Sequence, residues 1–392
     1  MVGEWHERRL GELTENFDSV RIPVKEADRR PGPYPYYGAS GIVDSVDRYL
    51  FDGEYLLIAE DGENLRTRKT PVAFLARGQF WVNNHAHIVC GNAEADTRFL
   101  MYALAQTDIG GYLTGSTIPK LTQSAMNRIP VLTPPIDEQR AIAAILGTLD
   151  DKIELNLRMN ETLESMARAL FKSWFVDFDT VRSKAEGHDP FYAPELWSLF
   201  PSSLDPDDKP AGWHRGTLID LCELKRGYDL PTGQRLPGPY PIVSSSGVSG
   251  SHSAAMANGP GVVTGRYGTI GDVYFINEAY WPLNTALYVR DFKGNSPRFV
   301  YYELLQVEFL QYSDKGAVPG INRNHLHQSP VVLPPRPLQQ AFEKLLMPVW
   351  AKQECNSKET ATLTALRDTL LPKLISGELR VKAAEKLVEA VA

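Results

Sequence analysis

Histidine and cysteine are the first residues to consider for chemistry in this 392-residue sequence. His85-Ala-His87 followed by Cys90 could supply metal ligands. This spacing matches no standard zinc pattern, and alternation along a strand explains it equally well. His325 and His327 give no stronger signal. We therefore expect no metal in this chain.

The acidic run Glu60-Asp61-Gly62-Glu63 could suggest a pair of catalytic carboxylates. The corresponding stretch two hundred residues later has Gly265, Arg266 and Gly268 instead. A duplicated catalytic site would be expected to keep its acids in both copies. The sequence therefore favours a protein without a catalytic centre of its own.

Motifs for cofactors are also missing. The sequence holds no Gly-x-x-x-x-Gly-Lys-Ser/Thr loop for ATP, and Gly265–Gly271 lacks the spacing of a dinucleotide-binding loop. Thr133-Pro-Pro-Ile136 and Leu333-Pro-Pro-Arg336 are similar to the motif of amino-methylating enzymes. Both lack the amide or carboxylate and the aromatic ring of that motif, which favours their interpretation as structural stops.

The elements around these residues form an internal duplication with a spacing of about 200 residues. Such a repeat indicates two copies of one structural unit. The matching pieces keep their order along both halves: Trp5-His6 and Trp213-His214, Pro31–Pro35 and Pro237–Pro241, Phe80-Trp81 and Tyr280-Trp281, Arg98-Phe99 and Arg298-Phe299, Pro134-Pro135 and Pro334-Pro335, and Gln139 and Gln339.

Each half begins with a region rich in Gly, Pro, aromatic and β-branched residues. Residues 55–59, 72–75, 261–264 and 272–276 are typical of strands between turns. Residues 98–106 and 298–306 are typical of short helices. The sequence therefore predicts an α+β fold, a tandem duplication of a mixed β-rich domain.

The sequence predicts one long helix after each β-rich region, over 137–175 and 338–374. Apolar and polar residues recur there at the 3-4 spacing of a coiled-coil seam, with polar residues in the middle. We expect the helices to form an antiparallel coiled coil; the alternative is that each caps its own sheet. The predicted seam residues are Leu146, Leu149, Ile153, Asn156, Asn160, Leu163, Leu170, Leu346, Val349, Asn356, Leu363 and Leu370.

These patterns give a domain order. It consists of a first domain (1–135), a first helix (136–176), a connector (177–210), a second domain (211–335), a second helix (336–376) and a charged tail (377–392). Three well-separated cysteines suggest no disulfide framework, so a reducing cytoplasm is expected. The net charge of -7 gives no electrostatic indication of nucleic acid.

Four segments carry a resemblance to a known family. They are Pro134–Leu146, Leu149–Ile153, Ala169–Phe178 and Leu366–Leu379. With the repeat, they resemble the specificity subunits of Type I restriction-modification systems over nearly the whole chain. That family has two target-recognition domains, each followed by a conserved helix, and the two helices pack antiparallel.

The resemblance implies a non-catalytic subunit that reads a bipartite DNA target, one half-site per domain. It implies assembly with two adenine-N6 methyltransferase subunits and, for cleavage, with two ATP-dependent translocase-endonuclease subunits. S-adenosylmethionine, ATP and Mg²⁺ would belong to those partners, and this chain would bind no cofactor. The helix pair would set the length of the unread spacer.

Basic and amide residues in loops are the candidates for DNA contact. Arg and Asn suit bidentate reading of guanine and adenine, whereas Lys more often contacts phosphate. The candidates are Arg66, Arg68, Lys69 and Lys120 in the first domain, and Arg266, Tyr267, Lys315, Asn322, Arg323 and Asn324 in the second. For each, the alternative is a solvated loop side chain.

Two other functions are compatible with the sequence. One is an interaction scaffold that binds protein or carbohydrate, with Tyr36-Tyr37 and Phe80-Trp81 as ligand platforms. The other is an enzyme with an unfamiliar active site.

The first domain holds 17 acidic and 14 basic residues over 1–135, so a DNA reader of this kind needs phosphate contacts from its partners.

Overall fold

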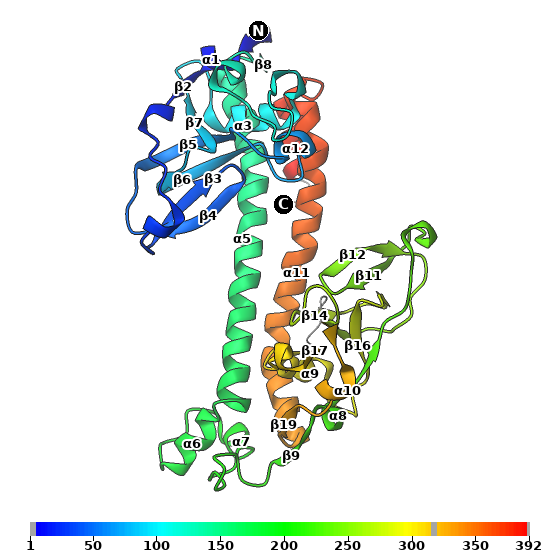
Figure 1. Ribbon diagram of the computed structural model, residues 1–392. Helices are drawn as coiled ribbons and strands as arrows, with labels where there is room; N and C mark the ends of the chain where they lie inside the picture. The colour runs from blue at the N-terminus through cyan, green and yellow to red at the C-terminus, as the bar shows by residue number, and fades with distance from the viewer. Residues whose placement is uncertain (1–4, 315–319, 390–392) are drawn as a thin grey trace. The chain divides into compact units, whose positions relative to one another are not determined.

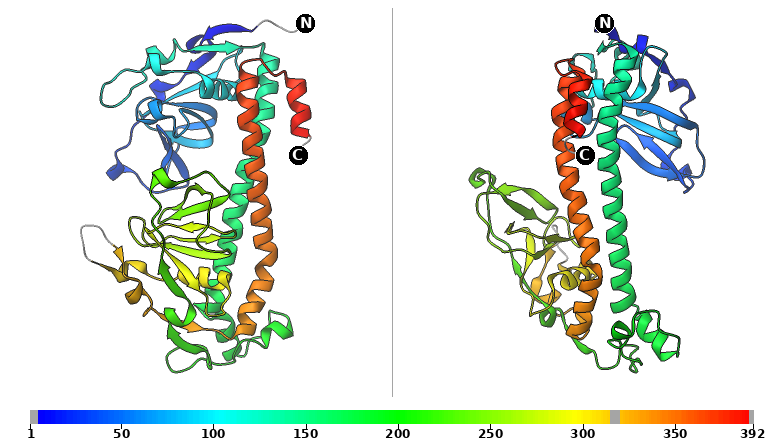
Figure 2. Two further views of the ribbon diagram at one scale, coloured as in Figure 1. Left: turned by 90° about the vertical axis from the view of Figure 1, so that its right-hand side faces the viewer. Right: turned by 180° about the vertical axis from the view of Figure 1, so that it is seen from behind.

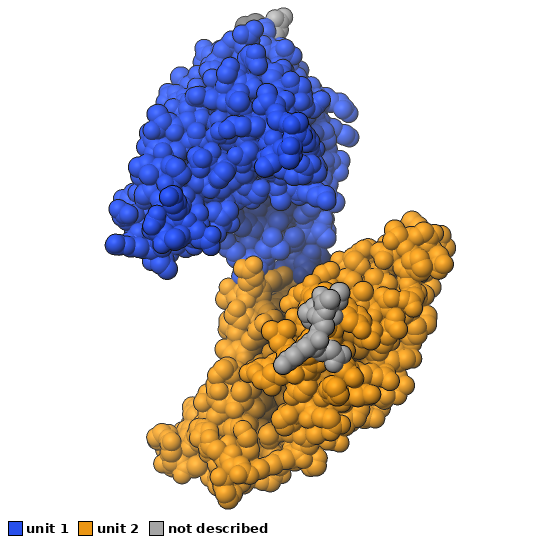
Figure 3. All heavy atoms as spheres, in the orientation of Figure 1, with its two compact units in different colours: residues 1–158, 355–392 blue, residues 159–354 orange. Residues whose placement is uncertain are grey.

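The computed structural model describes residues 5–314 and 320–389, which divide into two units. Unit 1 consists of residues 1–158 and 355–392, and unit 2 of residues 159–354 (Figure 3). The helices are α1 (Leu10–Leu13), α2 (Asn64–Thr67), α3 (Thr97–Gln106), α4 (Gln123–Met126), α5 (Ile136–Phe175), α6 (Asp179–Ala185), α7 (Pro194–Trp197), α8 (Leu218–Leu221), α9 (Pro297–Leu304), α10 (Arg323–Leu326), α11 (Arg336–Ile375) and α12 (Val381–Glu389).

The first β-rich domain is built on a six-stranded sheet in the order β2-β7-β5-β6-β3-β4 (Figure 1). Its central pair is antiparallel, with Leu56 opposite Leu75. The apolar end of β5, Leu56–Ala59, is buried, as a strand inside a covered sheet requires. The strands are β1 (His6–Arg9), β2 (Thr14–Asn16), β3 (Tyr34–Gly38), β4 (Gly41–Val46), β5 (Phe51–Ala59), β6 (Ala73–Val82), β7 (Ala86–Gly91) and β8 (Pro130–Thr133).

The second β-rich domain repeats this plan with the strands divided over smaller sheets. A four-stranded sheet has the order β10-β16-β13-β14, and a three-stranded sheet the order β12-β11-β15. Two short pairs, β17-β18 and β19-β9, complete the domain. The strands are β9 (His214–Thr217), β10 (Glu223–Arg226), β11 (Tyr240–Ser244), β12 (Gly247–His252), β13 (Gly261–Gly265), β14 (Val273–Ile276), β15 (Trp281–Pro282), β16 (Ala286–Asp291), β17 (Ser313–Asp314), β18 (Gly320–Ile321) and β19 (Pro330–Leu333).

Each long helix is fixed to its own domain by a buried glutamine in the first turn. The Gln139 amide donates to the carbonyls of Pro134 (2.9 Å) and Glu94 (3.0 Å) and accepts from the Asp96 amide (3.0 Å). Gln339, 3% exposed, donates to the Pro334 carbonyl at 3.1 Å. Because these bonds satisfy backbone groups beside the Pro-Pro stop, they set the direction in which the helix leaves the domain.

Within unit 1 the first part of α5 packs antiparallel against the last part of α11. Asp150 pairs with Arg367 at 2.9 Å, and the Asn156 amide donates to Glu359 at 2.8 Å. Predicted seam residues of both helices lie in the same core as the first sheet, among them Leu146, Leu149, Leu363 and Leu370.

Within unit 2 the other parts of the same helices pack in the same manner. The Asn160 amide donates to the Gln353 carbonyl and the Gln353 amide to the Asn160 carbonyl, both at 3.2 Å. Phe171 contacts Phe342 with ring centroids 5.6 Å apart. The antiparallel pairing predicted from the 3-4 pattern is therefore confirmed in each unit, and every predicted seam residue is buried or half-buried.

The segments after the long helices also fold. The expected connector contains α6 and α7, and Phe178 contacts Trp213 of the second domain edge-on at 5.7 Å. The expected tail contains α12, which lies beside the end of α11 and buries Ala384 in the core of unit 1 (Figure 2). In the described ranges, 5–314 and 320–389, no helix combines the length and the apolarity needed to cross a bilayer.

Candidate nucleic-acid interface

A cavity of about 360 Å³ lies in the second domain where β13 and β18 end. Five of the predicted DNA-contact residues line it: Arg266, Tyr267, Asn322, Arg323 and Asn324. Arg226, Leu287 and Ile321 complete the lining. The structure thus brings together residues that are separated by more than 50 positions in the sequence.

Three arginines converge on this cavity with few anionic partners. The Arg266 guanidinium lies over the Tyr267 ring at 4.4 Å from its centroid, which holds the side chain at the rim. Arg226 is 3.7 Å from the exposed carboxylate of Asp229. Within the described part of the chain, no carboxylate lies within ion-pairing distance of Arg266 or Arg323. The cavity is therefore a cationic surface feature.

The asparagines at the cavity have partly structural roles. The Asn322 side-chain oxygen accepts from the Asn324 amide at 3.0 Å and caps α10. Asn322 keeps its side-chain nitrogen for other contacts, and Asn324 is exposed. Lys315, also predicted to contact DNA, lies outside the described residues.

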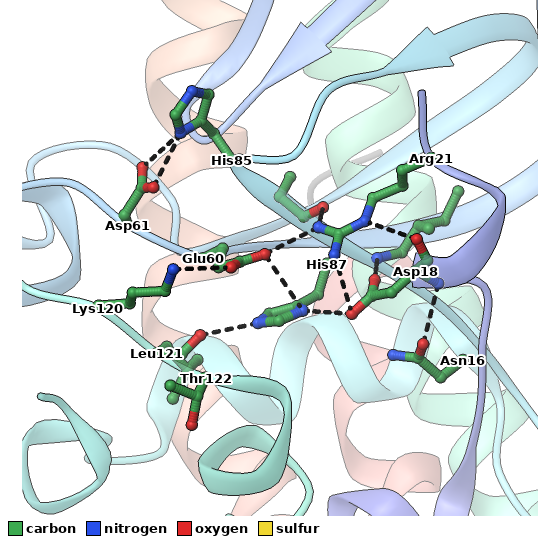
Figure 4. Close-up of polar contacts among 12 residues, drawn as sticks. Asn16, Asp18, Arg21, Glu60, Asp61, His85, His87, Lys120, Leu121 and Thr122 are labelled. Carbon is green, nitrogen blue, oxygen red and sulfur yellow. Dashed lines mark hydrogen bonds and ion pairs between the residues drawn. The ribbon is translucent and has the colours of Figure 1, made fainter. Parts of the chain in front are cut away.

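The first domain has a charge-compensated network at the corresponding place (Figure 4). Glu60 lies between Arg21 (2.9 Å) and Lys120 (3.2 Å), and Asp18 contacts Arg21 at 3.4 Å. His87 connects the Asp18 carboxylate (2.6 Å) to the Leu121 carbonyl (2.8 Å). Lys120, a predicted DNA contact, is thus half-exposed and paired with an acid.

The pKa values of both network acids are lowered. Burial raises the pKa of Asp18, but the hydrogen bonds from His87 and the Ile88 amide outweigh it. Burial also raises the pKa of Glu60, but the hydrogen bonds from Arg21 and Lys120 and the charge of His87 outweigh it. Both carboxyl groups are therefore ionised at neutral pH and neutralise the cations beside them.

The other candidates of the first domain lie in and after α2. Arg66 donates to the Gly115 carbonyl at 2.9 Å. Arg68, in a left-handed backbone conformation (φ 49°), donates to the Ala105 carbonyl at 3.0 Å and to the Thr107 carbonyl. Lys69 is exposed. Arg68 therefore fixes the loop to the end of α3, and Lys69 is the freer of these cations to reach a ligand.

The residues considered as metal ligands or as ligand platforms have structural contacts within the fold. His85 and His87 contact Asp61 (2.8 Å) and Asp18, and Cys90 lies opposite Glu15 in the sheet. Among the described residues, no group of three or more metal-binding side chains is suited to hold an ion. Tyr36, Phe80 and Trp81 are at most 7% exposed, so they are core residues and not ligand platforms.

Two stretches of the chain, residues 3–165 and 210–365, match the family model of the Type I restriction modification DNA specificity domain. The chain belongs to this family. The finding confirms the resemblance seen in the sequence, and the two matched stretches coincide with the two copies of the repeat.

Relatives of the family match the chain over most of its length. The specificity subunit of the Type I restriction enzyme MjaIX from Methanocaldococcus jannaschii is 26% identical over 97% of this chain and 94% of its own. The HindI specificity subunit of Haemophilus influenzae is 27% identical over 67% of this chain and 72% of its own. The crystal structure of the Type I S subunit from M. genitalium has the same fold, with a TM-score of 0.61, 18% identity and coverage of 95% and 96%.

Sequence reasoning missed Arg226 in this specificity-family chain. The residue ends β10, opposite Leu287 of β16, and enters the cavity from a strand and not from a loop. The repeat aligns Arg226 with Asp18 of the first domain, so a comparison of charges at equivalent positions of the two copies could have identified it. A search restricted to loops does not make that comparison.

Proposed function

We propose that this chain is the DNA-sequence reader of a Type I restriction-modification complex. Each β-rich domain would read one half-site of a bipartite target through base edges in the major groove. The observation that carries the proposal is the duplication itself: two copies of one specificity domain, each fixed by a buried glutamine to a helix of 40 residues.

The helices would determine the spacing between the half-sites. A helix of 40 residues is about 60 Å long at 1.5 Å per residue, which exceeds one turn of B-DNA. Asn156 and Asn160 occupy polar seam positions, and such residues fix the register of a helix pair. The two domains differ in their loop residues, so the half-sites would differ in sequence.

The partners would be two methyltransferase subunits for adenine-N6 methylation and two translocase-endonuclease subunits for cleavage, in the cytoplasm. S-adenosylmethionine, ATP and Mg²⁺ would be bound by those subunits, and this chain would supply no catalytic group. The first domain carries more acidic than basic residues, which supports a role for the methyltransferase subunits in contacting phosphates.

A mobility-shift assay tests this function. The chain is assembled with its methyltransferase partner and titrated with DNA that contains the target, identified by mapping adenine methylation in a strain that carries the system. We expect retention of the target duplex in the presence of unrelated competitor DNA, and weak binding by the chain alone. Equal competition by target and unrelated duplexes would contradict the proposal.

A further inference from the structure

The two domains place opposite charges at one corresponding position, where β5 and β13 end. The Leu121 amide donates to the Glu60 carbonyl at 2.7 Å, and the Ile321 amide donates to the Arg266 carbonyl at 2.9 Å. Leu121 and Ile321 are separated by the 200 residues of the repeat. Glu60 and Arg266 are therefore equivalent residues of the duplicated fold.

A second position shows the same inversion. Asp18 contacts His87 at 2.6 Å in the first domain, and Arg226 lies opposite Leu287 in the second. His87 and Leu287 are also separated by 200 residues. The two acids of the first domain thus correspond to two arginines of the second, and Arg323 adds a third cation where the first domain has Gln123.

The two arrangements differ in the exposure of their charged side chains and in how far those charges are balanced by neighbours. The side chains of Asp18 and Glu60 are 10% and 15% exposed, and Arg21 and Lys120 balance their charges. Arg226 and Arg323 are exposed, and Arg266 is half-exposed beside Tyr267. The first network satisfies its own charges, whereas the second leaves cations that face solvent across an open cavity.

We propose that the cavity formed by Arg226, Arg266 and Arg323 is a phosphate subsite for the DNA backbone, present in the second domain and absent from the first. This inference rests on the proposed function. It assigns to one half of the duplication a phosphate contact that the equivalent position of the other half lacks.

The number of cations favours a phosphate over a base. The edge of a guanine is a neutral pair of acceptors that one guanidinium satisfies. Three guanidinium groups around a neutral edge would keep their mutual repulsion, whereas a phosphodiester brings a full negative charge and two free oxygens. The charge balance of the domains agrees, since residues 211–335 hold 10 basic and 9 acidic residues, against 14 and 17 in residues 1–135.

The salt dependence of DNA binding tests this subsite. The full chain, assembled with its methyltransferase partner, is titrated with the target duplex and with an unrelated duplex of equal length over a range of salt concentrations. Arg266→Gln and Arg323→Gln are measured separately, so that a folding defect in one variant leaves the other informative. Arg290→Gln and Arg215→Gln are matched controls, because Arg290 pairs with Glu223 and Arg215 pairs with Asp205 and Asp207, all outside the cavity.

We expect each cavity variant to reduce the slope of log K against log salt by about 1 and to weaken both duplexes by the same factor, on the order of tenfold. The controls should leave the slope unchanged. An unchanged slope in both cavity variants overturns the inference, as does a loss confined to the target duplex, which identifies a base contact. If the unaltered complex does not prefer its target, the proposed function itself fails.

Discussion

The side-chain amide of Asn156 donates a hydrogen bond to the Glu359 carboxylate at 2.8 Å, in the seam between α5 and α11 within unit 1. Asn156 is 1% exposed, so its replacement removes a bond from a buried position. We predict that Asn156→Ala lowers the free energy of unfolding by about 1–3 kcal/mol. Urea denaturation followed by circular dichroism measures the change.

Leu157→Ala is the matched control for this variant. Leu157 is the next residue of the same helix and is 51% exposed, so its truncation removes little buried surface. The control should stay within about 0.5 kcal/mol of the unaltered chain. Equal losses in the two variants would show that the seam bond contributes no specific stability.

The buried glutamines give a second prediction. Gln139→Ala leaves the Pro134 and Glu94 carbonyls and the Asp96 amide without their bonds, and Gln339→Ala does the same for the Pro334 carbonyl. We expect each variant to lower the free energy of unfolding by about 2–3 kcal/mol. Arg140→Ala, at a 65% exposed neighbour, is the control; a glutamine variant as stable as this control contradicts the prediction.

The elements of the fold were predictable because their signals are local. The 3-4 spacing of Leu146, Leu149 and Ile153 requires only a helix, and α5 begins within one residue of the predicted start. The repeat added what one copy could not show, since Gln139 and Gln339 match in sequence and both donate to the carbonyl of the proline five residues earlier. The 3-4 spacing and the internal repeat were therefore the basis for predicting the long helices.

The site was less predictable because its contacts are long-range. Arg68 was selected as a loop cation, but its bonds to the Ala105 and Thr107 carbonyls depend on where α3 ends. Lys120 was selected in the same way, and its partner Glu60 is 60 residues away. Sequence reasoning identified charged residues in loops and could not tell a structural ion pair from a free cation.

The neighbouring cations Arg68 and Lys69 of the first domain should therefore have different roles. We predict that Lys69→Ala weakens DNA binding by the assembled complex about threefold to tenfold and lowers the salt slope, with no change in stability. Arg68→Ala should instead reduce the melting temperature, because the Ala105 and Thr107 carbonyls lose their hydrogen bonds. Mobility shifts at two salt concentrations and a thermal melt of each variant make the comparison. The opposite assignment of the two effects would refute it.

Glu303 of α9 gives a prediction for neutral pH. Burial of its carboxyl group raises its pKa to about 7, whereas an unfolded glutamate has a pKa of about 4.3. Between these values the folded chain binds more protons than the unfolded chain, so this residue makes stability fall as pH rises. We expect Glu303→Gln, which stays neutral, to be more stable than the unaltered chain at pH 8, by about 1–3 kcal/mol, and similar to it at pH 4.5.

Denaturation midpoints at several pH values between about 4.5 and 8 check this expectation. Glu308→Gln is the control, because Glu308 is exposed in the segment that follows α9. Its pH dependence should match that of the unaltered chain. A Glu303→Gln variant that keeps the full dependence would show that another group titrates there.

Asp18 should have the opposite pH dependence. Burial raises its pKa, but the hydrogen bonds from His87 and the Ile88 amide outweigh burial, so the pKa lies below the usual aspartate value. Stability from the ionised carboxylate is therefore present above about pH 4, the pKa of an unfolded aspartate, and is lost as pH falls through the lower folded value. We predict that Asp18→Asn lowers the free energy of unfolding by about 1–3 kcal/mol at pH 6 and that this difference shrinks toward pH 3.

Asp52→Asn, at an exposed position of β5, is the control, and its difference from the unaltered chain should not change between these pH values. If the Asp18→Asn difference is the same at both pH values, the loss comes from packing and not from the charge.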